Sequence, residues 1–474
     1  MYIYQSLAKS ISDAIYKGQL PQGAKLPSIR DFSSQHNVSI NSVKMAYRQL
    51  EDRGFIYARP QAGYFVASRI PALTQSKPIE NHQSLNVPHS NIERMLSTIL
   101  EYQHSDGYID LALACPEGER FYPSARLRKL TAQTLRNLRH TQSQYALPPG
   151  SHRLRSQIAR RGLSLGMVLS AKDILITHGA MEALTLAVRA TTQVGDRVAI
   201  ETPTFYNLYP MLDELNREIV HIPTHPDTGM CLKSLKTEIE NKPIKAVITV
   251  PSGHNPLGFT MPSTYREELV ELAHSQHFAI IEDAIYAELQ YDDHLIPNMK
   301  AFDRDGWVIT CGSFTKTIAP DFRIGWMEAG RFKDKIRQLK FTSTVSESVL
   351  LTETLGLFLE NGSYDLHMRY LKRLYHAQIE TVRACIAEHF PAGTRVSLPQ
   401  CGFILWIELP EYFDSLTFFH RALDEKILCM PGPLCSGNKQ FNHCLRLAVC
   451  FELDERRLAG IAKLGQLICR SLAP

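Results

Sequence analysis

The chain has 474 residues, a length at which two or three folding units are expected, and 44% of its residues are hydrophobic. With 21% charged residues, this composition excludes disordered, collagen-like and low-complexity chains, and no apolar run approaches the roughly 18–20 residues that cross a bilayer. Residues 1–75 hold nine basic and four acidic side chains, a net of +5, so the other 399 residues sum to −1. A small basic unit joined to a nearly neutral one is typical of a nucleic-acid-binding module attached to another domain.

The N-terminus and the cysteines indicate a cellular compartment. The first ten residues contain no apolar segment that ends in a small-residue cleavage site, and we therefore expect a cytoplasmic protein. Ten cysteines are scattered between Cys115 and Cys469, and none belongs to a CxxC pair. We expect free thiols in a reducing compartment and no metal site.

The first fifty residues carry three helical patterns. Apolar residues between Leu7 and Ile15 have helical spacing, and Pro21 closes that helix. Ser28 is placed to cap a short second helix, and Asn37 marks the turn that follows it. Ser39 can cap a third helix, whose apolar seam consists of Val43, Ala46, Tyr47 and Leu50.

The third helix also carries a polar row. Asn41, Lys44 and Arg48 have spacings of i, i+3 and i+7, which place them on one line along the helix. Two short strands follow, over residues 55–57 and 64–66, around a turn that contains Gly63. This order predicts a winged helix-turn-helix, in which the third helix enters the major groove of DNA. A three-helix interaction module with solvated basic residues is the alternative interpretation.

The same segment resembles a known family. The matching residues are Gly23, Leu26-Pro27-Ser28, Arg30, Val38-Ser39, Val43, Ala46-Tyr47, Leu50, Gly54, Ile56, Gly63 and Phe65-Val66. They resemble the GntR-type DNA-binding domain over residues 1–67. The resemblance implies that DNA is faced by Arg30, Ser39, Asn41, Lys44, Arg48 and Gly63. One position departs from the pattern, because Ile40 stands where the family often has arginine, and the operator sequence therefore cannot be borrowed from relatives.

Residues 68–91 predict an extended linker, because this stretch contains three prolines, many polar residues and no amphipathic period. We therefore expect a DNA-binding domain over residues 1–67, a linker over residues 68–91 and a second domain over residues 92–474.

From about residue 107, apolar runs rich in valine and isoleucine alternate with helical stretches. The runs span residues 174–177, 197–201, 246–250, 278–282 and 308–311. Such alternation predicts βα units and a mainly parallel sheet that is buried on both faces. Ligands bind at the carboxyl ends of the strands in sheets of this kind.

Reactive and phosphate-binding residues follow two of these runs. After the run that ends at residue 311, Lys316 can form an imine with an aldehyde, and Ser313 and Arg323 can hold a phosphate. After the run that ends at residue 282, Asp283 can pair with a protonated ring nitrogen and Tyr286 can bind a ring hydroxyl. Taken singly, a solvated lysine and a helix-capping aspartate are the more common explanations.

Three further segments complete the pattern. Asn255, within an Asn-Pro turn, offers an amide to the same hydroxyl. Gly179 and Ala180 stand at a strand-to-helix junction, where backbone N–H groups bind a phosphate. Phe205 offers a flat partner to an aromatic ring. Each of these also has an ordinary structural explanation, but the order and spacing of all five segments favour a common site.

Together the segments resemble the fold-type I pyridoxal-phosphate aminotransferases over about residues 107–470. The resemblance implies Lys316 as the Schiff-base lysine, Asp283 on the pyridine nitrogen, and Tyr286 and Asn255 on the ring oxygen, with Phe205 stacked on the ring. The implied phosphate contacts are Ser313, Arg323, Gly179, Ala180 and, from the partner subunit, Tyr145. Arg446 matches the arginine that clamps a substrate α-carboxylate. Cys115 and Cys401 depart from the pattern and leave the size of the substrate open.

The combination of a GntR-like winged helix, a linker and an aminotransferase-like domain resembles the MocR subfamily of bacterial transcriptional regulators. The expected fold is an N-terminal α+β winged helix-turn-helix joined to a large α/β domain with a mainly parallel sheet and a smaller C-terminal α+β subdomain. The resemblance implies a regulator that binds operator DNA and senses pyridoxal 5'-phosphate, an amino acid or amine effector, or both. It also implies a homodimer that exchanges its DNA-binding domains head to tail.

Two alternatives remain open. One is a metabolic aminotransferase whose N-terminal domain is accessory, and the other is a regulator that has lost cofactor binding. The presence of Lys316, Asp283, Tyr286, Asn255 and Arg323 argues against the second. A regulator without sustained turnover is compatible with residual transamination, so weak activity alone does not distinguish a regulator from an enzyme.

Overall fold

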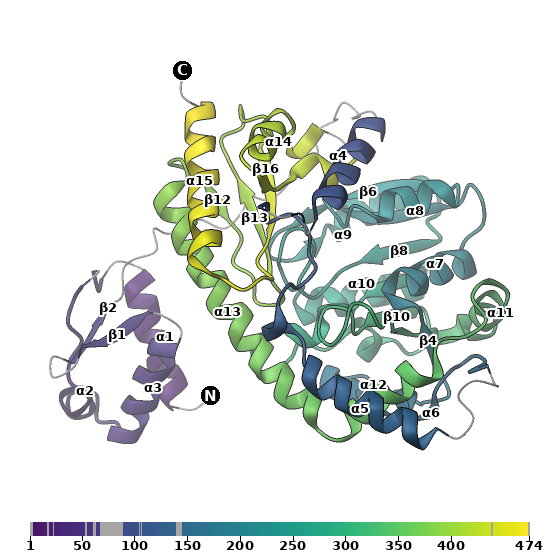
Figure 1. The fold of residues 1–474 in the computed structure, drawn as a ribbon, viewed down its shortest axis with the longest axis horizontal. Helices are drawn as coiled ribbons and strands as arrows, with labels where there is room; N and C mark the ends of the chain where they lie inside the picture. Colours follow the sequence, from purple (N-terminus) through teal and green to yellow (C-terminus); the bar gives the residue numbers. More distant parts are fainter. Residues whose placement is uncertain are drawn as a thin grey trace. The chain divides into compact units, whose positions relative to one another are not determined.

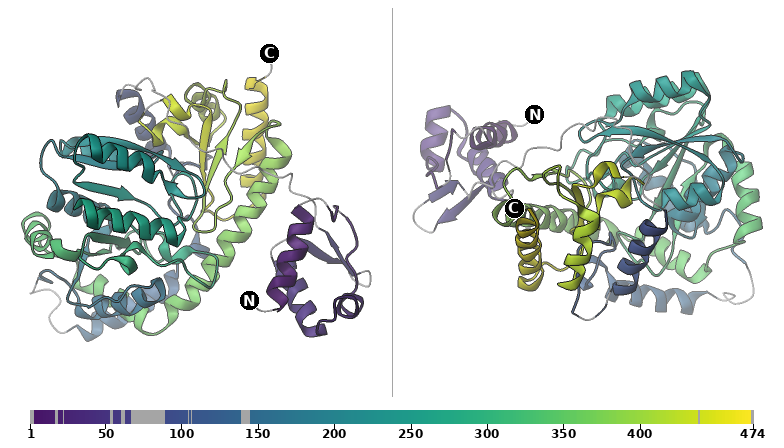
Figure 2. Two further views of the ribbon diagram at one scale, coloured as in Figure 1. Left: turned by 180° about the vertical axis from the view of Figure 1, so that it is seen from behind. Right: turned by 90° about the horizontal axis from the view of Figure 1, so that it is seen from above.

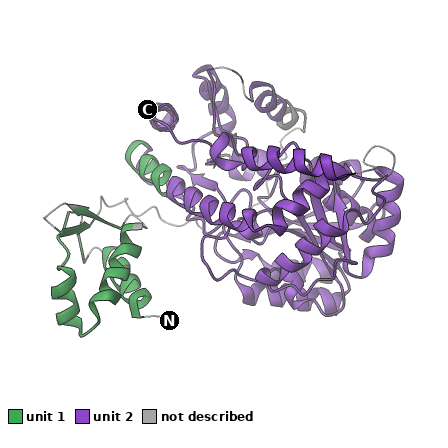
Figure 3. Ribbon diagram, turned by 60° about the horizontal axis from the view of Figure 1, so that its bottom comes forward, with its two compact units in different colours: residues 1–74, 380–389 green, residues 75–379, 390–474 purple. Residues whose placement is uncertain are grey.

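The structure is a computed structural model, and it describes residues 3–16, 19–21, 23–52, 55–59, 63–66, 89–103, 105, 107–138, 145–437 and 439–472. The chain divides into two compact units, coloured green and purple in Figure 3. They comprise residues 1–74 with 380–389, and residues 75–379 with 390–474.

The N-terminal unit contains the predicted three helices and hairpin. Its elements are α1 (Ile3–Tyr16), α2 (Ile29–His36), α3 (Ile40–Asp52), β1 (Ile56–Arg59) and β2 (Gly63–Val66). The two strands pair in an antiparallel register, and residues 23–26 extend the hairpin through the bonds from Leu26 N–H to Tyr64 O and from Val66 N–H to Ala24 O. The turn at residues 60–62 lies outside the described residues.

The α3 seam lies at the centre of this unit. Val43, Ala46, Tyr47 and Leu50 are all at most 1% exposed, as the spacing predicts. The predicted caps also form: Ser28 Oγ accepts the Asp31 N–H at 3.2 Å, and Ser39 Oγ accepts the Ser42 N–H at 3.1 Å. Asn37 adopts a left-handed conformation with φ of 51°, which ends α2 and starts the turn.

The predicted linker lies outside the described residues up to residue 88. Helix α4 (His89–Tyr102) begins at residue 89, so the last three residues of the predicted linker, 89–91, belong to the helix. Its first residues, His-Ser-Asn, are polar and suit a helix N-terminus as well as a linker, so composition did not place this boundary.

The second unit is built around an eight-stranded sheet in the order β4-β11-β10-β9-β8-β5-β6-β7. Its strands are β4 (Ile174–Thr177), β5 (Arg197–Thr202), β6 (Glu218–His225), β7 (Gly229–Met230), β8 (Ala246–Thr249), β9 (Ala279–Asp283), β10 (Val308–Ser313) and β11 (Gly325–Glu328). The consecutive pairs from β10 through β9, β8 and β5 to β6 are parallel, whereas β11 runs antiparallel to both β10 and β4. The sheet is therefore mainly parallel, as predicted.

Helices cover both faces of this sheet (Figure 1). They are α5 (Ser124–Asn137), α6 (His152–Gly162), α7 (Gly179–Thr191), α8 (Leu208–Glu214), α9 (Leu232–Asn241), α10 (Ser263–Gln276), α11 (Lys333–Ser343), α12 (Val349–Glu360) and α13 (Ser363–His389). Alternate residues of a strand enter different cores: Leu175 packs with α7, whereas Ile174 and Ile176 pack with α5, α6 and α12. Burial on both faces explains the continuous apolar runs in the sequence.

The C-terminal part forms a smaller α+β subdomain. Its elements are β12 (Arg395–Val396), β13 (Ile404–Glu408), α14 (Ser415–Asp424), β14 (Ile427–Leu428), β15 (Met430–Pro431), β16 (Cys444–Ala448) and α15 (Glu455–Leu472), and β14 pairs with β3 (Ile109–Asp110). The antiparallel sheet β12-β13-β16-β15 lies with α14 and α15 to one side of the large sheet (Figures 1 and 2). No helix among the described residues combines the length and the apolar character needed to cross a bilayer.

Candidate functional site

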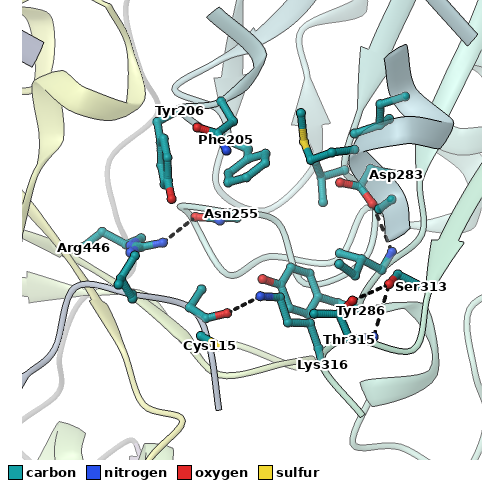
Figure 4. A pocket seen from close by; sticks show the side chains of 18 of the residues that line it. Cys115, Phe205, Tyr206, Asn255, Asp283, Tyr286, Ser313, Thr315, Lys316 and Arg446 are labelled. Carbon is teal, nitrogen blue, oxygen red and sulfur yellow. Dashed lines mark hydrogen bonds between the residues drawn. The ribbon is translucent and has the colours of Figure 1, made fainter. Parts of the chain in front are cut away.

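A pocket of about 220 Å³ lies at the carboxyl ends of the large sheet and is bordered by β16 of the small sheet. Its lining includes Ala180, Phe205, Asn255, Asp283, Tyr286, Ser313, Lys316, Arg323 and Arg446 (Figure 4). The structure therefore brings together nine of the residues that the sequence predicts for one site. Gly179 lies beside Arg323 without lining the pocket. Tyr145 does not line this chain's pocket, and its side chain is 78% exposed.

Lys316 stands three residues after β10, where the chain leaves the sheet. Its Nζ donates a hydrogen bond of 2.6 Å to the carbonyl oxygen of Ala114. Burial lowers the pKa of Lys316 from its usual value, although the nearby Cys115 and Cys450 act in the opposite direction. A lower pKa increases the fraction of neutral amine, which is the form that reacts with a carbonyl group.

Asp283 is the last residue of β9, and its carboxylate faces the pocket. It is 6% exposed, and its Oδ1 accepts the Ile285 N–H at 3.1 Å. Burial raises the pKa of Asp283 to about 6, and the negative charges of Glu282 and Glu201 add to this shift. No cation forms an ion pair with Asp283 among the described residues, so the carboxylate is available to a positively charged group in the pocket.

Arg446 and Asn255 meet across the boundary between the small and the large sheet. Arg446 Nη1 donates to Asn255 Oδ1 at 3.2 Å. The arginine is fully buried, yet its Nε and Nη2 have no hydrogen-bond partner among the residues that the structure describes. Since buried donors are normally satisfied, these two atoms mark a place where a ligand with acceptor oxygens fits.

The opposite side of the pocket suits a phosphate. Gly179 opens helix α7 with φ of 75°, and a Cβ at this position would lie 2.8 Å from Arg323 Nη2. Only glycine therefore allows the guanidinium to approach the helix N-terminus so closely. Ser313 Oγ lies beside it, within 2.8 Å of Thr315 Oγ1. A hydroxyl pair, a guanidinium and a helix N-terminus form a typical anion cradle.

Aromatic rings line the space between these two sides (Figure 4). Phe205 and Tyr206 contact each other edge-on, with ring centroids 4.9 Å apart. Tyr286 is 3% exposed, and burial raises the pKa of its phenol. The phenol therefore stays protonated near neutral pH and can donate to an oxygen. Tyr206 was not predicted, although its position directly after Phe205 was a signal.

A buried pair behind the pocket also escaped the sequence analysis. Glu201 and His254 are both fully buried, and their Oε2 and Nε2 atoms are 3.2 Å apart. Glu201 also accepts hydrogen bonds from Thr249 Oγ1 at 2.9 Å and Val250 N–H at 2.8 Å. The pair joins the strand that leads to Phe205 to the turn that carries Asn255. The sequence did contain an indication of this pair, because Glu201 is a charged residue within an apolar run that predicts a buried strand.

The two cysteines of the sequence analysis have different places. Cys115 lines the pocket, but Cys401 does not. The Cys401 thiol is buried behind Tyr286, where it donates to the Tyr286 carbonyl oxygen at 3.1 Å. Cys401 therefore does not form part of the pocket wall, and the size of the substrate stays a prediction.

The predicted DNA-facing residues lie at the surface of the N-terminal unit. The exposed residues are Arg30, Ser39, Asn41, Lys44, Arg48 and Gly63. Lys25 runs along the wing, with its Cε 3.5 Å from the place of a Cβ at Gly63. None of Lys25, Arg30, Lys44 and Arg48 forms an ion pair with another described residue, and these charges are free to meet phosphates.

The pocket fits pyridoxal phosphate. A buried carboxylate without a cationic partner suits a pyridinium nitrogen, the cradle around Gly179 suits a phosphate, and a half-buried lysine stands between them. The unpartnered atoms of Arg446 leave room for a second, acidic ligand.

Comparisons with known proteins agree with both units. Residues 109–461 match the family Aminotransferase class I and II, and residues 3–66 match the bacterial regulatory proteins of the gntR family. The chain is 33% identical to the uncharacterized HTH-type transcriptional regulator YjiR of Escherichia coli K12, over 99% of both chains. It is 32% identical to the regulator YdcR of the same organism, over 98% of both chains.

The solved structures show the same fold for the large unit. The multiple substrate aminotransferase from Thermococcus profundus superposes with a TM-score of 0.74 at 27% identity, covering 80% of this chain and 95% of that one. The predicted fold class is thereby confirmed. The chain belongs to the MocR type of GntR-family transcriptional regulators, in which a winged helix-turn-helix is joined to an aminotransferase class I and II domain, and its cofactor is pyridoxal 5'-phosphate.

Proposed function

We propose that this regulator binds operator DNA through α3 and the wing, and that an amino acid captured in the cofactor pocket changes its affinity for that DNA. The observation that carries the proposal is the buried Arg446, which lines the same pocket as Lys316. Its Nε and Nη2 form no hydrogen bond within the described part of the chain. A carboxylate on Arg446 and an amine near Lys316 are the two ends of an amino acid.

The pocket residues have the following proposed roles. Pyridoxal phosphate, when bound, supplies an aldehyde that captures amines and a ring that accepts electrons. Lys316 holds that aldehyde, Asp283 pairs with the ring nitrogen, and Phe205 stacks on the ring. Tyr286 and Asn255 bind the ring oxygen. The phosphate contacts are Ser313, Arg323, the backbone of Gly179 and Ala180, and Tyr145 of the partner subunit.

The charges of the pocket restrict the effector. Among the described residues that line it, the cations are Lys316, Arg323 and Arg446. Lys316 is assigned to the cofactor aldehyde and Arg323 to the cofactor phosphate. Arg446 is therefore the cation of this described lining that remains for the effector. The walls beside it are apolar or weakly polar and include Leu113, Cys115 and Tyr206. We infer an α-amino acid with one carboxylate and an uncharged side chain.

A regulatory response requires that the effector bind two conformations of the protein with different affinity. Arg446 belongs to the small sheet, whereas Lys316 belongs to a loop of the large sheet. An amino acid held at both ends therefore favours conformations in which these two parts are close. Two winged helices in a homodimer would read two half-sites, and we place this dimer in the cytoplasm with the DNA.

The first experiment is an absorbance titration. Wild-type protein, Lys316→Ala and the exposed control Lys233→Ala are supplied with pyridoxal phosphate, and single amino acids are added. We expect a visible band from cofactor bound through Lys316 in the wild type and the control, and none in Lys316→Ala. An effector should shift this band and also change the affinity for operator DNA. Absence of the band in the wild type would contradict the proposal.

The carboxylate contact has its own test. Arg446→Gln should keep the band but respond to the effector about 10- to 100-fold more weakly, because a charged hydrogen bond contributes roughly 1.5–3 kcal/mol. The response to the corresponding amine, which lacks the carboxylate, should not change. Equal losses for the amino acid and its amine would exclude Arg446 as the carboxylate site.

A metabolic aminotransferase is the second candidate, and the complete set of pocket residues favours it. Sustained turnover at about 1–10³ s⁻¹ with an amino acid and an oxo acid would support this function. Sequence-specific DNA binding without such turnover would support the regulator.

A further inference from the structure

The first residue of α3 is an exposed apolar side chain on a polar, basic helix face. Ile40 is 52% exposed and does not belong to the core cluster that contains Val43, Ala46 and Leu50. Its exposed neighbours on the same side of the helix are Asn41 and Lys44. The capped N-terminus at Ser39 and Ser42 fixes the start of the helix, so Ile40 has a defined place on it.

A single exposed isoleucine is not unusual on a protein surface. The basic helix face on which Ile40 lies is the reason to expect a contact with DNA. The face around Ile40 carries the cations Lys44 and Arg48, neither of which forms an ion pair with a described residue, and this unit has a net charge of +5 over residues 1–75. Such a face attracts the phosphates on both sides of a DNA groove. Once the helix lies in the major groove, Ile40 loses contact with water, and it then needs an apolar partner.

The major groove offers one apolar group, the C5-methyl of thymine. Asparagine pairs best with adenine there, through the N6 and N7 atoms. Ile40 and Asn41 are about 1.5 Å apart along the helix axis, so they reach the same base pair or adjacent pairs, which are spaced about 3.4 Å. We infer that Ile40 reads a thymine methyl and that each half-site contains an A·T pair under the start of α3.

This inference rests on the proposed operator binding, and the experiment separates the two. Full-length protein with pyridoxal phosphate first selects its site from a randomised DNA duplex pool. Each thymine of the selected site is then replaced by uracil, which pairs identically but lacks the methyl group. We expect one thymine per half-site at which uracil weakens binding about fourfold, the factor for burying one methyl group.

Variants assign that methyl group to Ile40. Ile40→Ala should bind the thymine and uracil duplexes equally, because the contact is gone in both. Met45→Ala is the matched control: this residue is 51% exposed on the same helix, about 140° around it from Ile40, and the fourfold ratio should persist. Ile40→Arg should select guanine at this position, since arginine binds guanine O6 and N7.

Each outcome has a separate meaning. A selected site at which no uracil substitution weakens binding would overturn the inference and leave operator binding intact. A fourfold ratio that persists in Ile40→Ala would assign the methyl contact to another residue and would also overturn it. A pool without any enriched sequence would overturn operator binding as well as the inference.

Discussion

The proposed pairing of Asp283 with the pyridine nitrogen predicts that the affinity for the cofactor depends on pH. The pKa of its carboxyl is raised to about 6 by burial, with Glu282 and Glu201 adding to the shift and Lys316 opposing it. A pyridinium nitrogen pairs only with the ionised form. We therefore expect the affinity for pyridoxal phosphate to fall below pH 6, by up to about tenfold for each pH unit. Equilibrium dialysis between pH 5 and 8 measures this.

The control for this prediction is Asp283→Asn. This variant should bind the cofactor weakly, and its affinity should not show the fall below pH 6 that is assigned to the Asp283 carboxyl. In the cofactor-free protein the same raised pKa makes the free energy of unfolding decrease as the pH rises, which is opposite to its effect on cofactor affinity. The folded state favours the neutral form of the Asp283 carboxyl. The contribution of this group to the free energy of unfolding is therefore fully present below about pH 4 and is lost as the pH rises through about 6. A wild-type affinity that is equal at pH 5 and pH 7 would contradict the assignment of Asp283.

Glu201 supports the pocket from behind. Its carboxylate accepts from Thr249 Oγ1 and Val250 N–H and lies 3.2 Å from His254 Nε2, all in the interior. His254 Nδ1 accepts the Leu257 N–H at 3.2 Å, whereas its Nε2 forms no hydrogen bond with a described residue although it lies 3.2 Å from Glu201 Oε2. Glu201→Ala leaves the buried Thr249 hydroxyl and the Val250 N–H without an acceptor. We expect a loss of about 2–6 kcal/mol in urea unfolding, because each unsatisfied buried donor costs roughly 1–3 kcal/mol.

The same variant should also weaken cofactor binding, because the turn that carries Asn255 loses its anchor. Glu201→Gln is the matched control, since it keeps one acceptor oxygen and the shape of the side chain, and it should lose less. A change below about 1 kcal/mol in Glu201→Ala would show that the pair is not needed to hold this turn.

Residues at strand ends are predictable, whereas contacts across the chain are not. Lys316 and Asp283 follow apolar runs whose carboxyl ends can be read from the sequence. The bond between Arg446 and Asn255 joins residues 191 positions apart, and no local pattern predicts it. Cys401 illustrates the same limit: it lies next to Gly402 in sequence, but only the fold places it behind Tyr286 rather than in the pocket.

The α3 helix holds the DNA-binding unit together. Leu50 is 1% exposed in the core of this small unit, and truncation of a buried leucine typically removes about 2–5 kcal/mol. A unit of this size has little stability to lose. We expect the small unit to unfold in an earlier transition than the large one. Leu50→Ala should abolish DNA binding and lower the temperature of this early transition, while the absorbance band of cofactor bound through Lys316 stays unchanged.

The matched control is Leu464→Ala in α15, a fully buried leucine of the large unit. Leu464→Ala should lower the temperature of the main transition, in which the large unit unfolds, and leave the temperature of the early transition unchanged. Calorimetry together with the absorbance of the bound cofactor distinguishes the two transitions. A parallel loss of DNA binding and of the cofactor band in Leu50→Ala would show that the units unfold together.

Five continuous apolar strands of the large sheet were predicted, whereas β6, its longest strand with eight residues, and the shortest strands were not. The five apolar runs became β4, β5, β8, β9 and β10 with ends that differ by no more than two residues. The strands β12, β14 and β15 have two residues each, which is too short for an alternating pattern to show. Strand β11 was also missed, because its antiparallel place between β4 and β10 depends on the fold around it.

For the whole molecule, the two units have separate hydrophobic cores, and each matches a different family. Communication between them therefore requires that effector binding favour one of two conformations, with a coupling energy of typically 1–3 kcal/mol. By reciprocity, operator DNA should change the affinity for the effector by the same factor as the effector changes the affinity for DNA.

The exposed Tyr145 carries a prediction about assembly. Its side chain is 78% exposed and does not line this chain's pocket, although the family pattern gives it a phosphate contact. If Tyr145 serves the pocket of the partner subunit, Tyr145→Phe should weaken cofactor binding about 10- to 100-fold, the range for one charge-assisted hydrogen bond. Lys316→Ala should lack the lysine-bound band in its own pocket.

Mixed dimers of these two variants test the exchange directly. In a dimer of one Tyr145→Phe chain and one Lys316→Ala chain, the only pocket with its lysine belongs to the first chain and receives an intact Tyr145 from the second. Differently tagged chains allow this dimer to be purified, and its band should form with wild-type affinity at half of the sites. If the affinity stays as weak as in the Tyr145→Phe homodimer, Tyr145 acts within its own chain or not at all. Because the readout is restored affinity in a mixture of two impaired chains, misfolding of either variant cannot produce the expected result.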